Sequence, residues 1–148
     1  DIHFVLVGDG ELKKGIRDLT VSHGMEGNFH FFDQTDRIAP YYAMSDCLVL
    51  PSLWEGCPFT AMEAMVMSIP VVASSVGGVG EIIEDRVSGL LVPPADAGSL
   101  ADAIEMLCED RRLRESLAEK GRRKILEKFL LAGKISNLED IYRRMVQA

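Results

Sequence analysis

The stretch that decides the fold is SDCLVLPSLWEGCPFTAMEAMVMSIPVVASSVGG, residues 45–78. Residues 47–50 form an uninterrupted apolar run, which is typical of a parallel strand covered on both faces. Pro51 and Gly56 bracket a turn, a helix follows from about Thr60, and residues 70–74 form a second apolar run. The stretch therefore predicts a strand, a turn, a helix and a second strand that ends near paired glycines.

Glu63 is the main polar residue in the predicted helix, where most positions from 61 to 67 are apolar. A helix that is apolar nearly all round is buried, and an unpaired buried charge is very costly. We therefore expect Glu63 to be buried with a partner or a ligand. This favours a functional glutamate over one that lies at an exposed helix edge.

Strands and helices alternate on both sides of this stretch. The expected upstream elements are a strand at 2–7, a helix at about 11–23, a strand at 28–32 and a short helix capped by Asp36. The expected downstream elements are a short helix at 79–83, a strand at 89–92, two helices capped by Asp96 and Asp110, and a final helix at roughly 134–146. The order predicts an α/β fold with a mostly parallel sheet of about five strands, which would bind a ligand at their carboxyl ends.

The composition and charge of the chain argue against several classes of function. The chain has 148 residues, enough for one domain, and its formal net charge of −7 argues against a nucleic-acid partner. The apolar stretches are too short to span a bilayer. In the helix after Asp110, which we expect to turn its apolar residues inward from Leu113 to Ile125, acidic and basic residues are interleaved. This favours a solvated, ion-paired face, so peripheral membrane contact has no support in the sequence.

Cysteine and histidine residues point to no metal site. Cys47, Cys57 and Cys108 are odd in number and lack metal-ligand spacing, which favours reduced thiols and a cytoplasmic location. His3, His23 and His30 fall outside any ligand motif. We therefore predict no bound metal.

Three strand-to-helix turns are rich in glycine or small residues, and the one after Gly56 is the best candidate for an anion site. The backbone amides of Phe59 and Thr60 could hold a diphosphate at the helix start. Glu63 could then accept hydrogen bonds from ribose hydroxyls, and Glu55 would face a sugar. The arrangement suits a nucleotide-activated sugar.

The rival interpretation is a dinucleotide-binding half, because Gly8-Asp9-Gly10 follows a strand and opens a helix. However, Lys13 stands where a third glycine is wanted, and no acid closes a strand near residues 27–31. A tight turn is therefore favoured at this position. The pair Gly77-Gly78 predicts either a plain turn or a turn that substrate approaches.

Several segments resemble the family-four (group 1) retaining glycosyltransferases of the GT-B fold. The signature lies in EGCPFTAMEA (55–64), IPVVA (69–73) and GGVGE (77–81), flanked in the same order by FVLVGDGELKKGI, SDCLVLPS and SGLLVPPAD. The resemblance covers about residues 4–127. It implies the C-terminal, donor-binding, Rossmann-like domain, which is half of a GT-B fold.

The resemblance also implies roles for individual residues. Glu63 matches the glutamate that binds the nucleotide ribose, and Glu55 matches the catalytic-site glutamate near the donor sugar and its anomeric centre. The remaining donor-binding positions are the amides of Phe59 and Thr60 at the diphosphate, Gly56 and Cys57 at the sugar, Gly8 and Gly10 on a loop near the cleft, and Glu81 at a motif position. Such enzymes need no metal cofactor, because basic side chains and helix-terminal amides stabilise the leaving phosphate.

The chain departs from the family pattern in several places. In the family, a βα unit before residues 2–7 carries the phosphate-clamping arginine and lysine, and we expect that this unit and the N-terminal acceptor domain are missing from residues 1–148. We therefore expect residues 1–148 to be a truncated donor-binding domain, which is catalytically inactive and binds nucleotide sugar weakly at best. Pro58 stands where many members have glycine. Ser68 and Arg86 replace glycines that are frequent in the family, which we interpret as loop variation.

In the family the missing strand lies between the strands at 2–7 and 47–50. We therefore expect these two strands either to pair directly, through local rearrangement, or to leave open edges that invite an edge-mediated oligomer. The alternatives to a transferase are a non-catalytic nucleotide-binding or interaction module of the same architecture and, with less support, an NAD-dependent oxidoreductase half.

Overall fold

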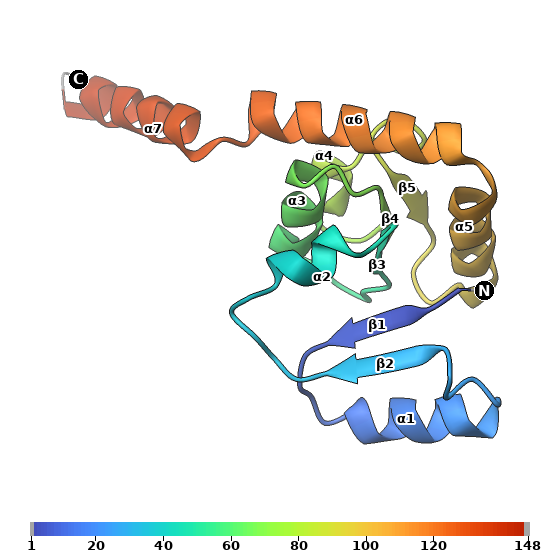
Figure 1. The fold of residues 1–148 in the computed structure, drawn as a ribbon. Coiled ribbons are helices and arrows are strands. Elements are labelled where there is room, and N and C mark those ends of the chain that lie inside the picture. The colour runs from blue at the N-terminus through green and yellow to red at the C-terminus, as the bar shows by residue number, and fades with distance from the viewer. Residues whose placement is uncertain (1, 147–148) are drawn as a thin grey trace. The chain divides into compact units, whose positions relative to one another are not determined.

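The structure of the chain, a computed structural model, describes residues 2–146, apart from the side chains of 131–134 and 136–137. It divides into two compact units, Asp1–Met44 and Ser45–Ala148, which are described in turn (Figure 1).

The first unit is a parallel strand pair with a helix against it. Its elements are β1 (Phe4–Val7), α1 (Lys13–Ser22), β2 (Phe29–Phe32) and α2 (Ala39–Ala43). Strands β1 and β2 pair in register, from Phe4 opposite Phe29 to Val7 opposite Phe32. The guanidinium of Arg17 lies 4.7 Å from the ring centre of Phe31, so a cation–π contact joins α1 to β2.

Helix α2 begins later than the sequence predicted, and Asp36 does not cap it. The residue before the helix is Ile38, which makes no side-chain capping bond, and Pro40 lies in the first turn. A proline fits the first turn because its missing N–H has no helical acceptor there. The proline therefore sets where α2 starts, and the expectation of an Asp36 cap was wrong.

The second unit is a three-stranded parallel sheet with helices. Its elements are β3 (Leu48–Leu50), α3 (Phe59–Val66), β4 (Val71–Ser74), α4 (Val79–Ile82), β5 (Leu90–Val92), α5 (Ala97–Glu109), α6 (Arg111–Lys128) and α7 (Leu131–Val146). The strand order is β3-β4-β5, which places β4 at the centre. All four residues of β4 are buried, whereas all three of β3 are only half-buried. The apolar run at 47–50 is thus less covered than predicted.

Side chains from the sheet, α5 and α6 form one core cluster. Its members are Val72, Leu90, Val92, Ala103, Leu107 and Leu117. Helix α6 turns Leu117, Gly121 and Ile125 inward, as predicted, and Leu113 packs against the cluster. A Cβ on Gly121 would lie 3.3 Å from the Met65 methyl, so the glycine lets α6 approach α3 closely (Figure 1).

Both predicted caps downstream are confirmed. The Ser99 amide donates to the Asp96 carboxylate over 3.0 Å at the start of α5, and the Leu113 amide donates to the Asp110 carboxylate over 2.9 Å at the start of α6. Hydrogen bonds to the charged form from the Ser99 amide and hydroxyl lower the pKa of Asp96. Each cap satisfies an amide that the helix itself leaves without an acceptor.

The α/β fold class is confirmed, and every strand pair among the described residues is parallel. The strands form two hydrogen-bonded sheets, of two strands in the first unit and three in the second. Within its own unit, each of β1 and β3 pairs with a single strand, and the expectation that the two strands pair directly or leave open edges stays a prediction. The edge-mediated oligomer stays a prediction.

Helix α3 ends in a Schellman motif that places Ser68 in a left-handed conformation. The Ser68 amide donates to the Met65 carbonyl over 3.0 Å and the Ile69 amide to the Ala64 carbonyl over 2.9 Å. The φ angle of Ser68 is 61°, and that of Arg86 is 58°. Left-handed backbone favours glycine because other residues have a Cβ that crowds the chain. Ser68 and Arg86 are loop positions, as expected, and each holds a non-glycine residue in a conformation that favours glycine.

We predict that Ser68→Gly stabilises the chain. Glycine relieves the left-handed strain while keeping both helix-ending hydrogen bonds, so the free energy of unfolding should rise by about 0.5–1 kcal/mol. Urea denaturation followed by circular dichroism measures the change. Ser68→Ala is the matched control, because it removes the hydroxyl but keeps the strain. Equal gains from both variants would show that strain at φ is not the cause.

Candidate functional site

The candidate site residues 55–63 and 77–81 lie on two loops and the helices that follow them. The first loop joins β3 to α3 and carries Glu55, Gly56 and Cys57, and the second joins β4 to α4 and carries Gly77 and Gly78. Because β3 and β4 are adjacent and parallel, their carboxyl ends lie at the same edge of the sheet. The sheet therefore brings the two loops within reach of each other.

The paired glycines let the two loops touch backbone to backbone. The Gly78 amide donates to the Glu55 carbonyl over 3.1 Å. A Cβ on Gly77 would lie 1.9 Å from the Glu55 carbonyl oxygen, and one on Gly78 would lie 2.1 Å from that of Gly56. No side chain fits at such distances, and the φ of Gly77, 46°, also favours glycine. The backbone carbonyls of Glu55 and Gly56 therefore pack directly against Gly77 and Gly78.

The Glu55 side chain is oriented by Ser52, a residue that the sequence analysis missed. Glu55 is half-buried, and its carboxylate accepts a hydrogen bond of 2.8 Å from the Ser52 hydroxyl. The only sequence signal was the spacing of three residues within a tight loop. The Gly78 amide therefore fixes the backbone carbonyl of Glu55, and the Ser52 hydroxyl orients its side chain.

The start of α3 is partly engaged within its own loop. Pro58 precedes the helix and makes no side-chain capping bond. The Phe59 amide, one of two amides predicted to hold a diphosphate, donates to the Cys57 carbonyl over 2.9 Å. The side chains of Phe59 and Thr60 are exposed. An anion at this helix start would have to replace the Cys57 carbonyl at the Phe59 amide.

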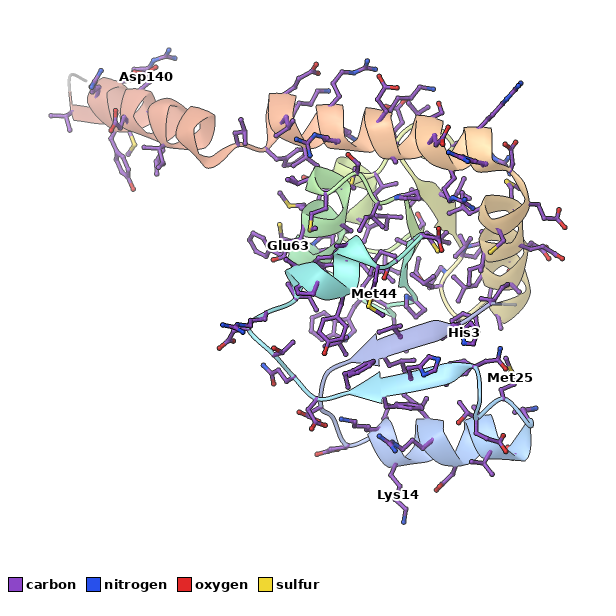
Figure 2. All side chains as sticks on the ribbon, in the orientation of Figure 1. His3, Lys14, Met25, Met44, Glu63 and Asp140 are labelled. Atoms are coloured by element: carbon purple, nitrogen blue, oxygen red, sulfur yellow. The ribbon has the colours of Figure 1, made fainter. Side chains whose placement is uncertain are left out.

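Glu63 is exposed, which corrects the expectation that it is buried (Figure 2). Helix α3 buries Ala61, Ala64 and Met65, whereas positions 60, 63 and 67 form an exposed stripe at helical spacing. The stripe was hidden in the sequence because one of its members, Met67, is apolar yet 38% exposed. The expectation that α3 is buried on nearly every side is therefore wrong.

Two further features lie near the carboxyl ends of the strands. Glu81 is exposed on α4, and its amide donates to the Gly78 carbonyl over 3.2 Å. A hollow of about 200 Å³ is lined by the last residues of β4 and β5 and by residues that follow β3 and β5, among them Pro51, Pro93 and Leu100. None of the predicted site residues lines it.

In the first unit, Gly8 and Gly10 lie on the loop after β1, which an ionic cluster fixes. The Lys13 ammonium contacts Asp9 at 2.8 Å and Asp33 at 2.7 Å, and the Gln34 amide donates to Asp9 over 3.0 Å. Lys13, at the position where a dinucleotide fingerprint wants glycine, ties α1 to the ends of both strands. This arrangement favours the tight-turn interpretation of Gly8-Asp9-Gly10.

The described residues contain no group of three or more histidine, cysteine or acidic side chains that could hold a metal ion. The three cysteines are free thiols, and burial, with the nearby Cys108 and Asp46, raises the pKa of Cys47 to about 11. No helix among the described residues is long and apolar enough to cross a membrane.

Gly77→Ala and Gly78→Ala should each destabilise the second unit, because the added methyl must push the two loops apart. We expect a loss of roughly 1–3 kcal/mol in urea denaturation. Gly80→Ala is the matched control: it lies on α4, and its Cβ would meet nothing within 4 Å. A control as destabilised as the two test variants would refute the close-approach argument.

The Asp9–Lys13–Asp33 cluster predicts a stability change in acid. Hydrogen bonds from Lys13 and Gln34 lower the pKa of Asp9, so its contribution is present above the carboxyl's ordinary pKa of about 4 and is lost as pH falls further. Thermal melts between pH 7 and pH 3 should show Asp9→Asn less stable than the parent at neutral pH, with the gap closing in acid. Because Asp9 is exposed, the effect is small.

Known proteins are similar to the chain in both sequence and fold. Residues 1–124 match the family described as glycosyl transferases group 1. Alpha-D-kanosaminyltransferase of Streptomyces kanamyceticus is 33% identical over 147 residues, which are 98% of this chain and 38% of that protein. The chain therefore spans about two-fifths of the length of this relative.

Two solved structures superpose closely on the chain. The C-terminal domain of LpcC, a group 1 glycosyl transferase of Francisella tularensis, is 29% identical with a TM-score of 0.75, over 82% of this chain and 64% of that one. HepE of Anabaena, in complex with UDP-glucose, is 25% identical with a TM-score of 0.89, over 96% of this chain and 41% of that one. The chain belongs to the group 1 glycosyl transferases and corresponds to the C-terminal domain of these GT-B proteins.

Proposed function

We propose that the chain is the donor-binding domain of a retaining glycosyltransferase of the hexosyltransferase type. The whole protein would transfer a sugar from a nucleotide-diphosphate sugar to an acceptor, in polysaccharide or glycolipid synthesis in the cytoplasm. The observation that carries the proposal is the Glu55–Gly56 loop, which Gly77 and Gly78 hold at the start of α3. The UDP-glucose in the HepE complex supports the choice of ligand class.

The start of α3 is the proposed diphosphate site. The net charge of −7 repels a diphosphate overall, so the attraction must come from local groups. Helix-terminal amides and the positive end of the helix dipole supply it. In this proposal the Phe59 amide exchanges its Cys57 acceptor for a phosphate oxygen, and the Thr60 amide provides a second contact. Gly56 and Cys57 then lie beside the sugar.

The two glutamates have separate proposed roles. Glu63 lies four residues beyond Phe59, about 6 Å along the helix axis, which matches the step from a diphosphate to a ribose. Its exposure leaves the carboxylate within reach of ribose hydroxyls. Glu55, oriented by Ser52, is proposed to face the donor sugar near its anomeric centre. Gly8, Gly10 and Glu81 are proposed as outer contacts of the donor.

The proposed reaction uses no metal cofactor. Basic side chains and helix-terminal amides would stabilise the leaving phosphate in place of a metal ion. In the family, those basic side chains lie on a βα unit, and no segment of residues 1–148 resembles that unit. We therefore propose that the 148-residue chain binds a nucleotide sugar weakly and transfers no sugar by itself.

Calorimetric titration with UDP and with UDP-sugars, repeated with GDP and ADP compounds, tests the two glutamate roles separately. Glu63→Ala should weaken the nucleotide and the nucleotide sugar alike, by about tenfold, since a hydrogen bond to a charged group is worth roughly 1.5–3 kcal/mol. Glu55→Ala should weaken only the nucleotide sugar. Both effects should persist in EDTA.

Glu105→Ala, an exposed glutamate on α5, is the matched control and should bind like the parent. Unchanged affinity in Glu63→Ala would remove that residue from the site. Nucleotide binding with no response to Glu55→Ala, and no transfer by a longer form of the protein, would instead favour a non-catalytic binding module. Binding of NAD in preference to nucleotide sugars would favour the oxidoreductase half.

A further inference from the structure

Two histidines, 27 residues apart in the chain, meet at the strand pair of the first unit. His3 directly precedes β1, and His30 is the second residue of β2 (Figure 2 labels His3 at the start of its strand). The His3 Nδ1 and His30 Nε2 atoms lie 3.1 Å apart, with ring centres 5.3 Å apart and ring planes inclined by 28°. Both side chains are exposed.

The backbone, rather than the rings, sets this geometry. Val5 lies opposite His30 in the parallel register, and alternate residues of a strand share a face, so His3 and His30 lie on the same face. The Asn28 side chain donates to the Ile2 carbonyl over 2.8 Å, next to His3 in the chain. The facing nitrogens are therefore brought together by the folded strand pair.

The distance between the nitrogens suits a shared metal ion. At present, one ring N–H hydrogen-bonds to the lone pair of the other ring. With metal–nitrogen bonds of about 2.0–2.1 Å, a separation of 3.1 Å gives an N–metal–N angle of about 98°. This value lies between the octahedral angle of 90° and the tetrahedral angle of about 109°. Both rings must rotate to aim their lone pairs at one ion, and their exposure leaves room for that rotation.

We propose that His3 Nδ1 and His30 Nε2 form a bidentate site for a divalent transition-metal ion such as Ni²⁺, Cu²⁺ or Zn²⁺. Imidazole nitrogens suit these ions, whereas Mg²⁺ and Ca²⁺ prefer oxygen ligands. On binding, the proton between the rings moves through solvent to the other nitrogen of its own ring, so both facing nitrogens present lone pairs and no net proton is lost. Water completes the coordination, because both rings are exposed.

This site is independent of the proposed nucleotide-sugar site. It uses none of the donor-binding residues proposed above. It also assigns no part in sugar transfer to the metal. The link is to stability: an ion that binds the folded strand pair and not the unfolded chain stabilises the fold by mass action.

Titration of the 148-residue chain with Ni²⁺ in a calorimeter at pH 7.5 tests the proposal. One ion should bind per chain, and the melting temperature should rise with Ni²⁺. His3→Ala and His30→Ala should each lower the affinity by about 100-fold or more, because a two-point chelate becomes a single contact. Mg²⁺ should produce neither effect.

His23→Ala is the matched control, because His23 is exposed in the same unit and follows α1. It should bind Ni²⁺ like the parent. Metal binding that survives in a His3→Ala/His30→Ala double variant would come from other ligands, such as the three free cysteines that every variant keeps, and would overturn the proposal. Equal losses in the control and the test variants would overturn it too. His3→Gln, which keeps a hydrogen-bonding side chain, should also lose Ni²⁺ affinity while circular dichroism shows the parent fold.

Discussion

The contact of two glycines with one peptide sets the geometry of the candidate site. Adjacent parallel strands bring the 55–57 and 77–78 loops to one edge of the sheet, but only the absence of two side chains lets their backbones touch. The contact fixes the carbonyl of Glu55, while Ser52 orients its carboxylate. One acid is thus held by a backbone constraint and by a side-chain hydrogen bond that do not depend on each other.

Features with local causes could be predicted from the sequence. Residue patterns predicted the five strands of the described residues, and Asp96 and Asp110 cap the helices that their positions indicated. A cap depends on residues within one turn of each other, so a single sequence carries the signal. The role of the paired glycines could not be read in this way, because their partner, the Glu55–Gly56 peptide, lies more than twenty residues away. The approach of His3 to His30 was invisible for the same reason.

Three expectations from the sequence were wrong, and in each case a local structural effect explains the difference. Counting apolar residues made α3 look buried on every side, but burial depends on which helix face they occupy, and the exposed stripe contains both Glu63 and an apolar methionine. Near residue 36, the aspartate was a reasonable cap, but a proline in the first turn fixed the start of α2. At 47–50, an apolar strand without alternation suggested full coverage, yet β3 is half-buried.

The left-handed conformations of Ser68 and Arg86 have a consequence for how the family can diversify. A change to glycine at either position would raise the stability of the fold, since it releases strain without altering any proposed donor contact. Substitutions that retune a binding site commonly weaken a fold. A chain with glycine at these two loops could therefore tolerate costlier changes around Glu55 and Glu63, which links the proposed donor specificity to residues outside the proposed donor site.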